Sequence, residues 1–267
     1  MKKSMKTAVI TGASRGVGKA VAEALAREGW RLILNCRSRF DTLDQVAAAL
    51  AEQTEVTAIH GPIDEAVLGK YLGIDLNAFT PVNPANVSDP FARRTHIEED
   101  SADQLLLINN GGISTFHLAQ EVTDAELEEM LDANLKTMFR TTRAMIPYLL
   151  KAGKGAVINI SSVTASSSSP HGACYGATKA GLLSFSRSLF DEVRKYGVRV
   201  TAVLPDMTDT ALYRNADFEA DPQWDAHLNP EDVADAVRYA LSVREGSCVP
   251  EIMIRPQLHR IHKKPRT

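Results

Sequence analysis

The sequence contains little cysteine and no long apolar run. Only three of its 267 residues are cysteine (Cys36, Cys174 and Cys248), an odd number with no Cys-x-x-Cys pair. This argues against a disulfide framework or a metal site and favours a reducing compartment. No run approaches the length of a membrane span, and the basic start at residues 1–6 is not followed by the apolar core of a signal peptide. We therefore expect a soluble, cytoplasmic protein.

The sequence also lacks a strong excess of either charge. The formal net charge is -3, with 24% charged and 44% hydrophobic residues, the ordinary balance of a globular protein. This gives no reason to expect a nucleic acid or a membrane as partner. The basic tail at 259–266 is an exception, which we interpret as a short solvated terminus without function. The length fits one large α/β domain over residues 1–267.

Short apolar runs alternate with segments of helical periodicity through most of the chain. Strands are expected at 8–10, 32–34, 56–59, 105–108, 156–160, 198–204 and 249–254, and helices around 17–25, 43–50, 124–151, 175–195 and 230–242. This alternation, with continuous apolar strands, is typical of a parallel sheet that is covered on both faces. The predicted fold class is α/β, a doubly wound parallel sheet with helices on both faces.

One long segment departs from this alternation. Residues 61–103 contain glycine and proline at Gly61, Pro62, Pro81, Pro84 and Pro90, which break any regular pattern. An irregular stretch of this length is a surface excursion, or else an active-site or subunit-contact element. The surface excursion is the preferred interpretation.

A glycine-rich turn joins the first expected strand to the first expected helix. Gly12, Gly16 and Gly18 follow a Gly-x-x-x-Gly-x-Gly spacing. Glycine lets the backbone turn tightly and approach a pyrophosphate without a Cβ in the way. The free N–H groups at the start of the next helix would face that anion. The turn therefore predicts a dinucleotide site, and a turn that binds nothing is the alternative.

The end of the second expected strand indicates which dinucleotide would bind. The segment 35–39 (NCRSR) has no carboxylate to bond the ribose hydroxyls and repel a 2′-phosphate. Arg15 lies in the glycine turn, so the guanidinium groups of Arg15 and Arg37 are expected to converge on that phosphate. NADP(H) is therefore preferred over NAD(H). Two solvated surface arginines are the alternative.

Tyr175 and Lys179 lie four residues apart at the start of an expected helix, which places them on one face. The ammonium group is expected to lower the pKa of the tyrosine and make it an acid or base near neutral pH. Ser162 follows an apolar strand, where its hydroxyl would face the ligand crevice and donate to a substrate carbonyl. Ser161 should point to the opposite side of the strand. For Tyr-x-x-x-Lys alone, a half-buried tyrosine beside a solvated lysine is the alternative.

These motifs together resemble the short-chain dehydrogenase/reductase superfamily, over about residues 6–255 apart from the excursion. The resemblance implies a single Rossmann-like domain in which Ser162, Tyr175 and Lys179 are catalytic. It implies that Asn134 is the fourth catalytic residue, which holds a water of a proton relay, and that residues 207–228 form a flap over the substrate. It also implies a homo-dimer or homo-tetramer.

The resemblance implies cofactor contacts as well. The segment 109–112 (NNGG) resembles the family's Asn-Asn-Ala-Gly motif, and Asp206 follows Pro205 where the family commonly has glycine. Asp64 would lie near the adenine. The expected cofactor-binding residues are Gly12, Ser14, Arg15, Gly16, Val17, Gly18, Arg37, Asn109, Gly111, Tyr175, Lys179, Pro205 and Thr210.

The expected activity is that of an oxidoreductase that interconverts a ketone or aldehyde and an alcohol with NADPH, acting on a small-molecule carbonyl or alcohol substrate. Tyr175 would be the general acid or base. A non-catalytic dinucleotide-binding regulator and a 3-oxoacyl thioester reductase are the alternatives. Nucleophilic catalysis by Cys174 beside His171 is a third.

Overall fold

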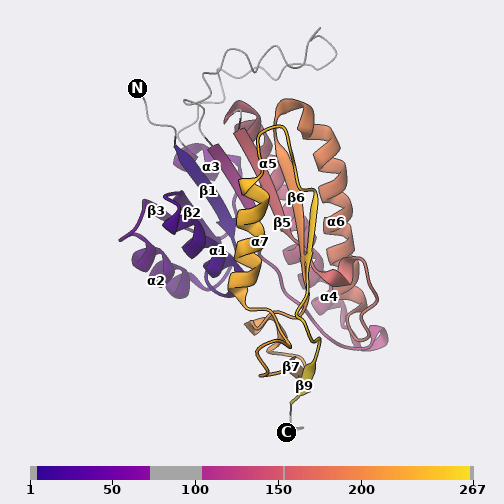
Figure 1. Cartoon of the computed structure of the whole chain (residues 1–267). Coiled ribbons are helices and arrows are strands. Elements are labelled where there is room, and N and C mark those ends of the chain that lie inside the picture. Colours follow the sequence, from indigo (N-terminus) through magenta and orange to yellow (C-terminus); the bar gives the residue numbers. More distant parts are fainter. Residues whose placement is uncertain (1–4, 73–103, 153, 265–267) are drawn as a thin grey trace.

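The computed structural model describes residues 5–72, 104–152 and 154–264. Within these residues, seven parallel strands form one sheet in the order β3-β2-β1-β4-β5-β6-β8. The strands are β1 Lys6–Thr11, β2 Arg31–Cys36, β3 Val56–His60, β4 Gln104–Asn109, β5 Lys154–Ile160, β6 Arg199–Pro205 and β8 Glu251–Ile254. Their carboxyl ends point downward in Figure 1. The doubly wound parallel sheet that the sequence predicts is confirmed.

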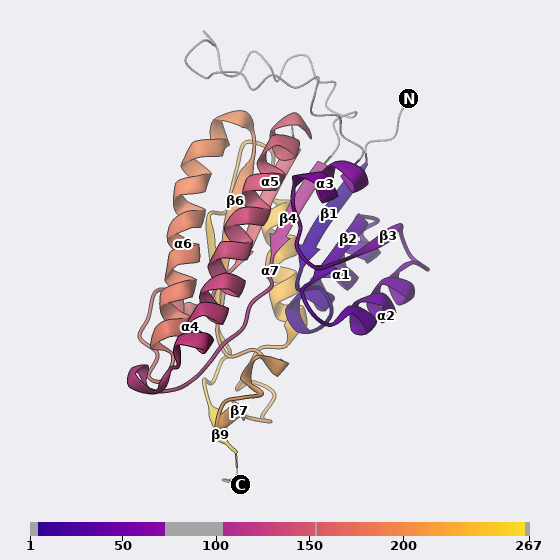
Figure 2. The same cartoon turned by 180° about the vertical axis from the view of Figure 1, so that it is seen from behind.

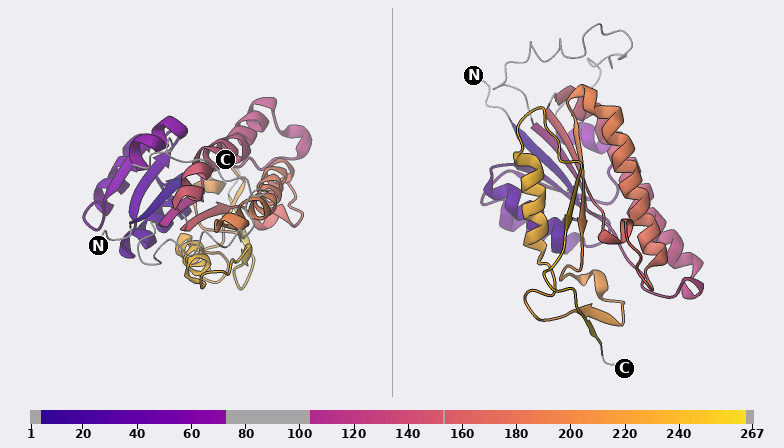
Figure 3. Two further views of the ribbon diagram at one scale, coloured as in Figure 1. Left: turned by 90° about the horizontal axis from the view of Figure 1, so that it is seen from above. Right: turned by 45° about the vertical axis from the view of Figure 1, so that its right-hand side comes forward.

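Helices cover both faces of this sheet. They are α1 Gly16–Arg27, α2 Phe40–Leu50, α3 Glu65–Leu72, α4 Asp124–Leu131, α5 Thr137–Ala152, α6 Ala173–Val193 and α7 Pro230–Ser242. The α1, α2 and α7 helices pack on one face, and α3, α5 and α6 pack on the other (Figures 1 and 2). Figure 3 shows the sheet edge-on between α7 and α6. None of the helices in the described ranges is long and apolar enough to cross a membrane.

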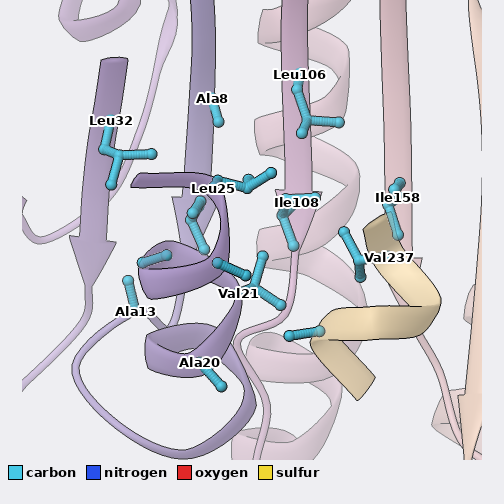
Figure 4. Close-up of a cluster of buried hydrophobic side chains, with 14 of the residues drawn as sticks. Ala8, Ala13, Ala20, Val21, Leu25, Leu32, Leu106, Ile108, Ile158 and Val237 are labelled. Atoms are coloured by element: carbon cyan, nitrogen blue, oxygen red, sulfur yellow. The ribbon is translucent and has the colours of Figure 1, made fainter. Parts of the chain in front are cut away.

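Alternate residues of the strands supply the two hydrophobic cores. In β1, Ala8 and Ile10 belong to the core beneath α1 and α7, whereas Val9 belongs to the core on the opposite face. Figure 4 shows Val21 of α1 and Val237 of α7 directed at the sheet. Because successive side chains point to opposite faces and both faces are covered, the strands appear in the sequence as continuous apolar runs.

Two helices begin where the sequence supplies a capping box. In α4 the Thr123 hydroxyl accepts a hydrogen bond from the Glu126 N–H, and the Glu126 carboxylate accepts one from the Thr123 N–H. In α7 the Asn229 N–H donates to Asp232 at 2.7 Å, and Pro230 opens the helix. These bonds satisfy N–H groups that have no partner inside the helix. Short 3-10 turns occupy Ala119–Glu121, Val163–Ala165, Arg194–Tyr196 and Ala211–Tyr213, and a π-helical turn at Asp132–Lys136 joins α4 to α5.

Part of the segment that the sequence predicts as irregular is helical. Helix α3 occupies Glu65–Leu72, so the prediction of irregular structure is wrong there, and residues 73–103 lie outside the described ranges. Leu68 and Leu72 are buried in the core on the α5 side of the sheet. The Asp64 carboxylate accepts the Val67 N–H at 2.9 Å and so caps α3, while its place near an adenine stays a prediction. A helix of eight residues depends on such docking, which the local pattern does not reveal.

The basic tail is solvent-exposed but is not an unpaired end of the chain. Strand β9 (Ile261–Lys263) pairs antiparallel with β7 (Phe218–Ala220), which lies within the expected substrate flap. Both strands lie beyond the carboxyl ends of the main sheet (Figure 1). The expected exposure is confirmed for residues 259–263, whereas the strand pairing was not expected. Three-residue strands give no periodic signal in the sequence, and their pairing depends on segments that are far apart along the chain.

Candidate active site

A cleft runs along the carboxyl ends of the strands, where the order of the sheet reverses between β1 and β4. It is lined by the glycine turn after β1, by the end of β2, by the loops after β4 and β5, by the first turns of α6, and by the segment after β6. In open α/β sheets, ligands bind at this kind of position. The cleft brings together most of the residues that the sequence selects, and these are Gly12, Ser14, Arg15, Gly16, Val17, Arg37, Gly111, Ser162, Tyr175, Lys179, Pro205 and Thr210.

The glycine turn is shaped by close backbone contacts. Gly12 has a φ of +64°, and a Cβ there would lie 2.7 Å from the Cα of Gly111. A Cβ on Gly18 would overlap the Gly12 carbonyl oxygen, so Gly18 lies behind the turn and packs against it without lining the cleft. Asn110 holds the turn from the β4 side, because its Nδ2 donates to the carbonyl oxygens of Thr11 and Gly12 at 3.2 and 3.1 Å. Only glycine fits at these contacts.

The start of α1 is open to an anion. Arg15 stands at the N-cap and makes no side-chain capping bond, and the first turn contains no acidic residue. This differs from α4 and α7, whose capping boxes satisfy their first N–H groups. The free N–H groups and the positive end of the helix dipole of α1 therefore face the cleft.

Three cationic side chains come together at this end of the cleft. The pKa of Arg15 is lowered by burial, then by the nearby charge of Arg39, and then by that of Arg214. Arg37 also lines the cleft, but its guanidinium pairs with Glu129 at 2.8 Å and with Asp132 at 3.3 Å. Arg15 and Arg37 line the same cleft, so their convergence on a phosphate stays a prediction. Arg39 and Arg214 are the cationic side chains whose charges act on Arg15.

Ser162, Tyr175 and Lys179 meet at the other end of the cleft. Tyr175 and Lys179 lie one turn apart on α6 and are 5% and 4% exposed. The Lys179 Nζ lies 5.8 Å from the centre of the Tyr175 ring and donates to the Ile160 carbonyl at 3.0 Å. The Ser162 Oγ accepts hydrogen bonds from the N–H and the hydroxyl of Thr164 at 3.2 and 3.0 Å. The sequence expectation that these three groups are neighbours agrees with this geometry.

Burial is the main cause of the pKa shifts of Tyr175 and Lys179. The pKa of Tyr175 is raised well above its ordinary value by burial and by the nearby Tyr213, while hydrogen bonding from Ser162 acts in the opposite direction. Burial lowers the pKa of Lys179 to about 8. The expectation that Lys179 lowers the pKa of Tyr175 is therefore wrong for the protein without a cofactor. Tyr175 is neutral at neutral pH, which is the form that can donate a proton.

Asn134 lies behind the catalytic group in the π-helical turn. Its amide donates to the Ile113 carbonyl and to the Thr178 hydroxyl, each at 2.9 Å, and its Oδ1 accepts the Ile113 N–H at 2.9 Å. The side chain therefore fastens the loop after β4 to α6. The water of a proton relay stays a prediction. A Cβ on Gly112 would lie 3.1 Å from the Asn134 Oδ1 and 3.5 Å from the Lys179 Nζ, so this loop passes closely over both groups.

Asn109 is not a cleft residue. It is fully buried, and its Nδ2 donates to Thr142 at 2.7 Å and to Asn159 at 2.8 Å. Asn159 in turn donates to Ser186 at 2.8 Å, which continues this network to α6. The cofactor role expected of Asn109 is therefore wrong, and its neighbour Asn110 faces the cleft in its place. Successive strand residues point to opposite faces, so a shift of one residue exchanges the two roles.

An aromatic cluster covers the side of Tyr175. The Phe116 ring lies 5.7 Å from the rings of Tyr175 and Tyr213, and 5.1 Å from the ring of Phe218. The Tyr213 and Phe218 rings are 5.6 Å apart. Tyr213 and Phe218 belong to the flap that is expected at residues 207–228. Phe116 is not found from the sequence, because it stands alone in an irregular loop.

The segment after β6 is fixed by Asp206, the residue that departs from the family pattern. Its carboxylate accepts the Met207 N–H at 2.8 Å and lies 3.2 Å from the His259 Nδ1 and 3.7 Å from the Arg255 Nε. The turn is thus tied to the C-terminal segment by charge, a role that glycine would not provide.

Comparison with known proteins agrees with this architecture. The family model described as short chain dehydrogenase matches residues 6–67 and 95–220. An uncharacterized oxidoreductase of Staphylococcus epidermidis is 31% identical over 258 residues, which cover 94% of this chain and 97% of that protein. The chain belongs to the short-chain dehydrogenase family.

Solved structures are similar as well. An alcohol dehydrogenase from the archaeon Thermococcus sibiricus, complexed with 5-hydroxy-NADP, has a TM-score of 0.74 and 28% identity over 96% of this chain and 99% of that one. A 3-ketoacyl-(acyl-carrier-protein) reductase from Brucella melitensis, complexed with NADH, has a TM-score of 0.71 at 21% identity over 94% and 97% of the two chains. The second likeness concerns the fold alone.

The expected nucleophilic pair is not formed in this short-chain dehydrogenase. No hydrogen bond joins Cys174 to His171 in the described part of the chain, and His171 occupies a turn with a φ of +63° before α6. Ser161 donates to the Lys179 carbonyl at 2.9 Å and supports α6 from the β5 side. Among the described residues, no group of three or more His, Cys, Asp or Glu side chains is arranged to hold a metal ion.

Proposed function

We propose that this short-chain dehydrogenase is an NADPH-dependent reductase of ketones or aldehydes, with Tyr175 as the proton donor. One observation carries the proposal. Ser162, Tyr175 and Lys179 meet at one end of a cleft whose other end holds an uncapped helix start and a cluster of arginines. A dinucleotide with a phosphate at one end and a reactive ring at the other has this layout.

The residues of the cleft fit a bound NADPH. The pyrophosphate would face the N–H groups of the first turn of α1, which Gly12 leaves accessible. Arg15 and Arg39 would bind the 2′-phosphate, and β2 ends without a carboxylate that would repel it. The adenosine end would thus distinguish NADPH from NADH. The similar archaeal alcohol dehydrogenase, which was solved with an NADP derivative, supports this preference.

The protein's own groups would carry the proton chemistry. NADPH, when bound, supplies the hydride that adds to the carbonyl carbon. Ser162 would donate a hydrogen bond to the carbonyl oxygen as negative charge develops on it. Tyr175 would transfer its proton to that oxygen and regain one from solvent, so that over the whole reaction the carbonyl gains the hydride and one proton and becomes an alcohol. Lys179 would stabilise the resulting phenolate as its ammonium form, which the protein holds below a pH of about 8.

The test is oxidation of NADPH in the presence of a panel of ketones, aldehydes and a 3-oxoacyl thioester. Tyr175→Phe should lower kcat at least about 100-fold, the typical contribution of a positioned general acid. NADPH binding should change less than about twofold, because the ring remains. Tyr239→Phe, an exposed tyrosine on α7, is the matched control and should keep the full rate.

Two results would contradict the proposal. One is a Tyr175→Phe variant that retains most of its rate. The other is a wild-type protein that binds NADPH tightly but oxidises it with none of the carbonyl compounds, which is the behaviour of a non-catalytic regulator.

A further inference from the structure

The substrate side of Tyr175 is formed by aromatic rings. Phe116, Tyr213 and Phe218 surround one another at centroid distances between 5.1 and 5.7 Å, and Phe116 also contacts the Tyr175 ring at 5.7 Å. We call Phe116, Tyr213 and Phe218 the aromatic wall. It lies at the edge of the catalytic group, where a carbonyl carbon would have to be placed.

Tyr213 is the member of this wall that reaches the cleft. It lines the cleft together with Tyr175, whereas Phe116 and Phe218 pack behind it. Burial raises the pKa of Tyr213 to about 12, with a smaller opposing effect from hydrogen bonding to the Thr208 backbone. Tyr213 is therefore neutral throughout the working pH range. It therefore adds an uncharged aromatic side chain to the lining of the cleft.

The backbone around Tyr213 is held by two side chains, Ser114 and Lys264, that are distant from it in the sequence. On one side, the Ser114 hydroxyl donates to the Leu212 carbonyl at 2.9 Å. On the other side, the Lys264 Nζ donates to the carbonyl oxygens of Tyr213 at 2.8 Å, Ala216 at 3.0 Å and Arg214 at 3.3 Å. One ammonium group thus binds three carbonyl oxygens of a single turn.

The C-terminal segment brings Lys264 to this position. Strand β9 pairs with β7 so that Lys263 stands opposite Phe218, and the Lys264 N–H donates to the Asp217 carbonyl at 2.8 Å. The same pairing therefore places Phe218 in the aromatic wall and Lys264 beneath the turn that carries Tyr213. Charge-assisted hydrogen bonds of this kind restrict the turn to one geometry.

We propose that Tyr213 selects the substrate and that Lys264 positions Tyr213 for this task. The substrate class is a neutral ketone or aldehyde with an aromatic ring next to the carbonyl group. The ring would pack against Tyr213 in the offset or edge-on geometry that aromatic pairs favour. The inference rests on the proposed function, since it concerns the same site, and it names what that site accepts.

The experiment compares two ketones that differ only in the ring. Acetophenone and cyclohexyl methyl ketone have the same carbon skeleton, but only the first is aromatic. Their intrinsic reactivities differ, so the measured quantity is the change in the ratio of their kcat/KM values between variants. Tyr213→Ala should lower this ratio, acetophenone over cyclohexyl methyl ketone, by roughly three- to tenfold, the value of one aromatic contact. Tyr213→Phe keeps the ring and should keep the ratio within about twofold.

Lys264 is tested through the same ratio. Lys264→Met should lower it in the same direction as Tyr213→Ala, mainly by raising KM for acetophenone, while kcat/KM for cyclohexyl methyl ketone changes little. Lys264→Arg retains a cationic donor and should restore most of the ratio. Lys263→Met is the matched control, because Lys263 is the exposed neighbour in β9, and it should leave the ratio unchanged. Thermal unfolding of each variant separates selectivity from loss of fold.

The possible outcomes are distinct. If wild-type protein reduces neither ketone and no other carbonyl compound, the proposed function fails and this inference fails with it. If the wild type is active and depends on Tyr175, but the ratio is the same in Tyr213→Ala and wild type, only the selecting role of Tyr213 is refuted. If Tyr213→Ala shifts the ratio and Lys264→Met does not, the positioning role of Lys264 is refuted.

Discussion

Replacing Lys179 by methionine should make the cofactor-free protein more stable while abolishing its activity. Lys179 is 4% exposed, and its Nζ has one hydrogen bond, to the Ile160 carbonyl at 3.0 Å. No carboxylate is paired with it among the described residues. A buried ammonium without a counter-charge is costly to fold, so its presence indicates selection for chemistry and not for stability.

The magnitude follows from the pKa. Burial lowers the pKa of Lys179 from its ordinary 10.5 to about 8, which corresponds to roughly 3 kcal/mol against the charged form. At neutral pH the group is charged in both the folded and unfolded states, so folding carries this cost in full. Methionine removes the cost but leaves the Ile160 carbonyl without its donor, a loss of roughly 1 kcal/mol. The free energy of unfolding should therefore rise by roughly 2 kcal/mol.

The pH dependence has a definite sign. Because the folded pKa lies below the unfolded one, the folded wild type binds fewer protons than the unfolded chain between pH 8 and pH 10.5. The Lys179 contribution to stability therefore rises with pH across this window. The advantage of the methionine variant should be largest below pH 8 and should shrink toward pH 10.5. The reductive rate of the wild type should fall above pH 8, as the ammonium form is lost.

The assay is urea unfolding of the cofactor-free protein at pH 7 and at pH 9.5, followed by tryptophan fluorescence, with the carbonyl-dependent oxidation of NADPH measured in parallel. Lys195→Met, an exposed lysine just beyond α6, should change the stability by less than about 0.5 kcal/mol. A Lys179→Met variant that is less stable than wild type at pH 7 would refute the reasoning. So would a stability gain that is the same at both pH values.

Two further predictions concern the cofactor end of the cleft. Gly18→Ala should lower the free energy of unfolding by about 2 kcal/mol and abolish NADPH binding, because the new Cβ would overlap the turn backbone. Gly29→Ala, at a φ of +75° with open space around it, is the control and should leave NADPH binding intact. Equal binding by both variants in fluorescence titrations would contradict this account. Arg15→Ala and Arg39→Ala should each weaken NADPH binding by roughly tenfold and NADH binding by less than about threefold. Arg37→Ala should have a smaller effect, because the Arg37 guanidinium is already paired with two carboxylates. An equal loss of affinity for both cofactors in calorimetric titrations would disprove the assignment.

Much of the fold could be predicted from the sequence, since its determinants are local. The strands of a sheet covered on both faces must be apolar on both faces, and a helix that covers it must repeat every three to four residues. The alternation of the two patterns therefore specifies the layers. Helix α3 and the pair β7–β9 could not be predicted in this way, because they are short and are stabilised by contacts with distant segments.

The same distinction between local and distant contacts applies to the candidate site. Sequence spacing predicts the glycine turn and the pair Tyr175–Lys179, because a turn and a helix face are set by neighbouring residues. The prediction from the sequence that Asn109 faces the cofactor is wrong, because Asn109 lies on the other side of its strand. Its true environment, a buried network with Thr142 and Asn159, depends on which helix packs behind β4.

The sequence by itself determined the sheet, the glycine turn and the identity of the groups that could move a proton. Only the tertiary structure decided the protonation and the ion pairing of these groups. Burial raises the pKa of Tyr175 although a lysine lies one turn away. Two carboxylates that are remote in the sequence pair with Arg37, and the charges of Arg39 and Arg214 act on Arg15. The C-terminal Lys264 fixes the turn that carries Tyr213. The physical reason is that desolvation and charge pairing depend on everything packed around a group, whereas spacing along the chain fixes only its nearest neighbours.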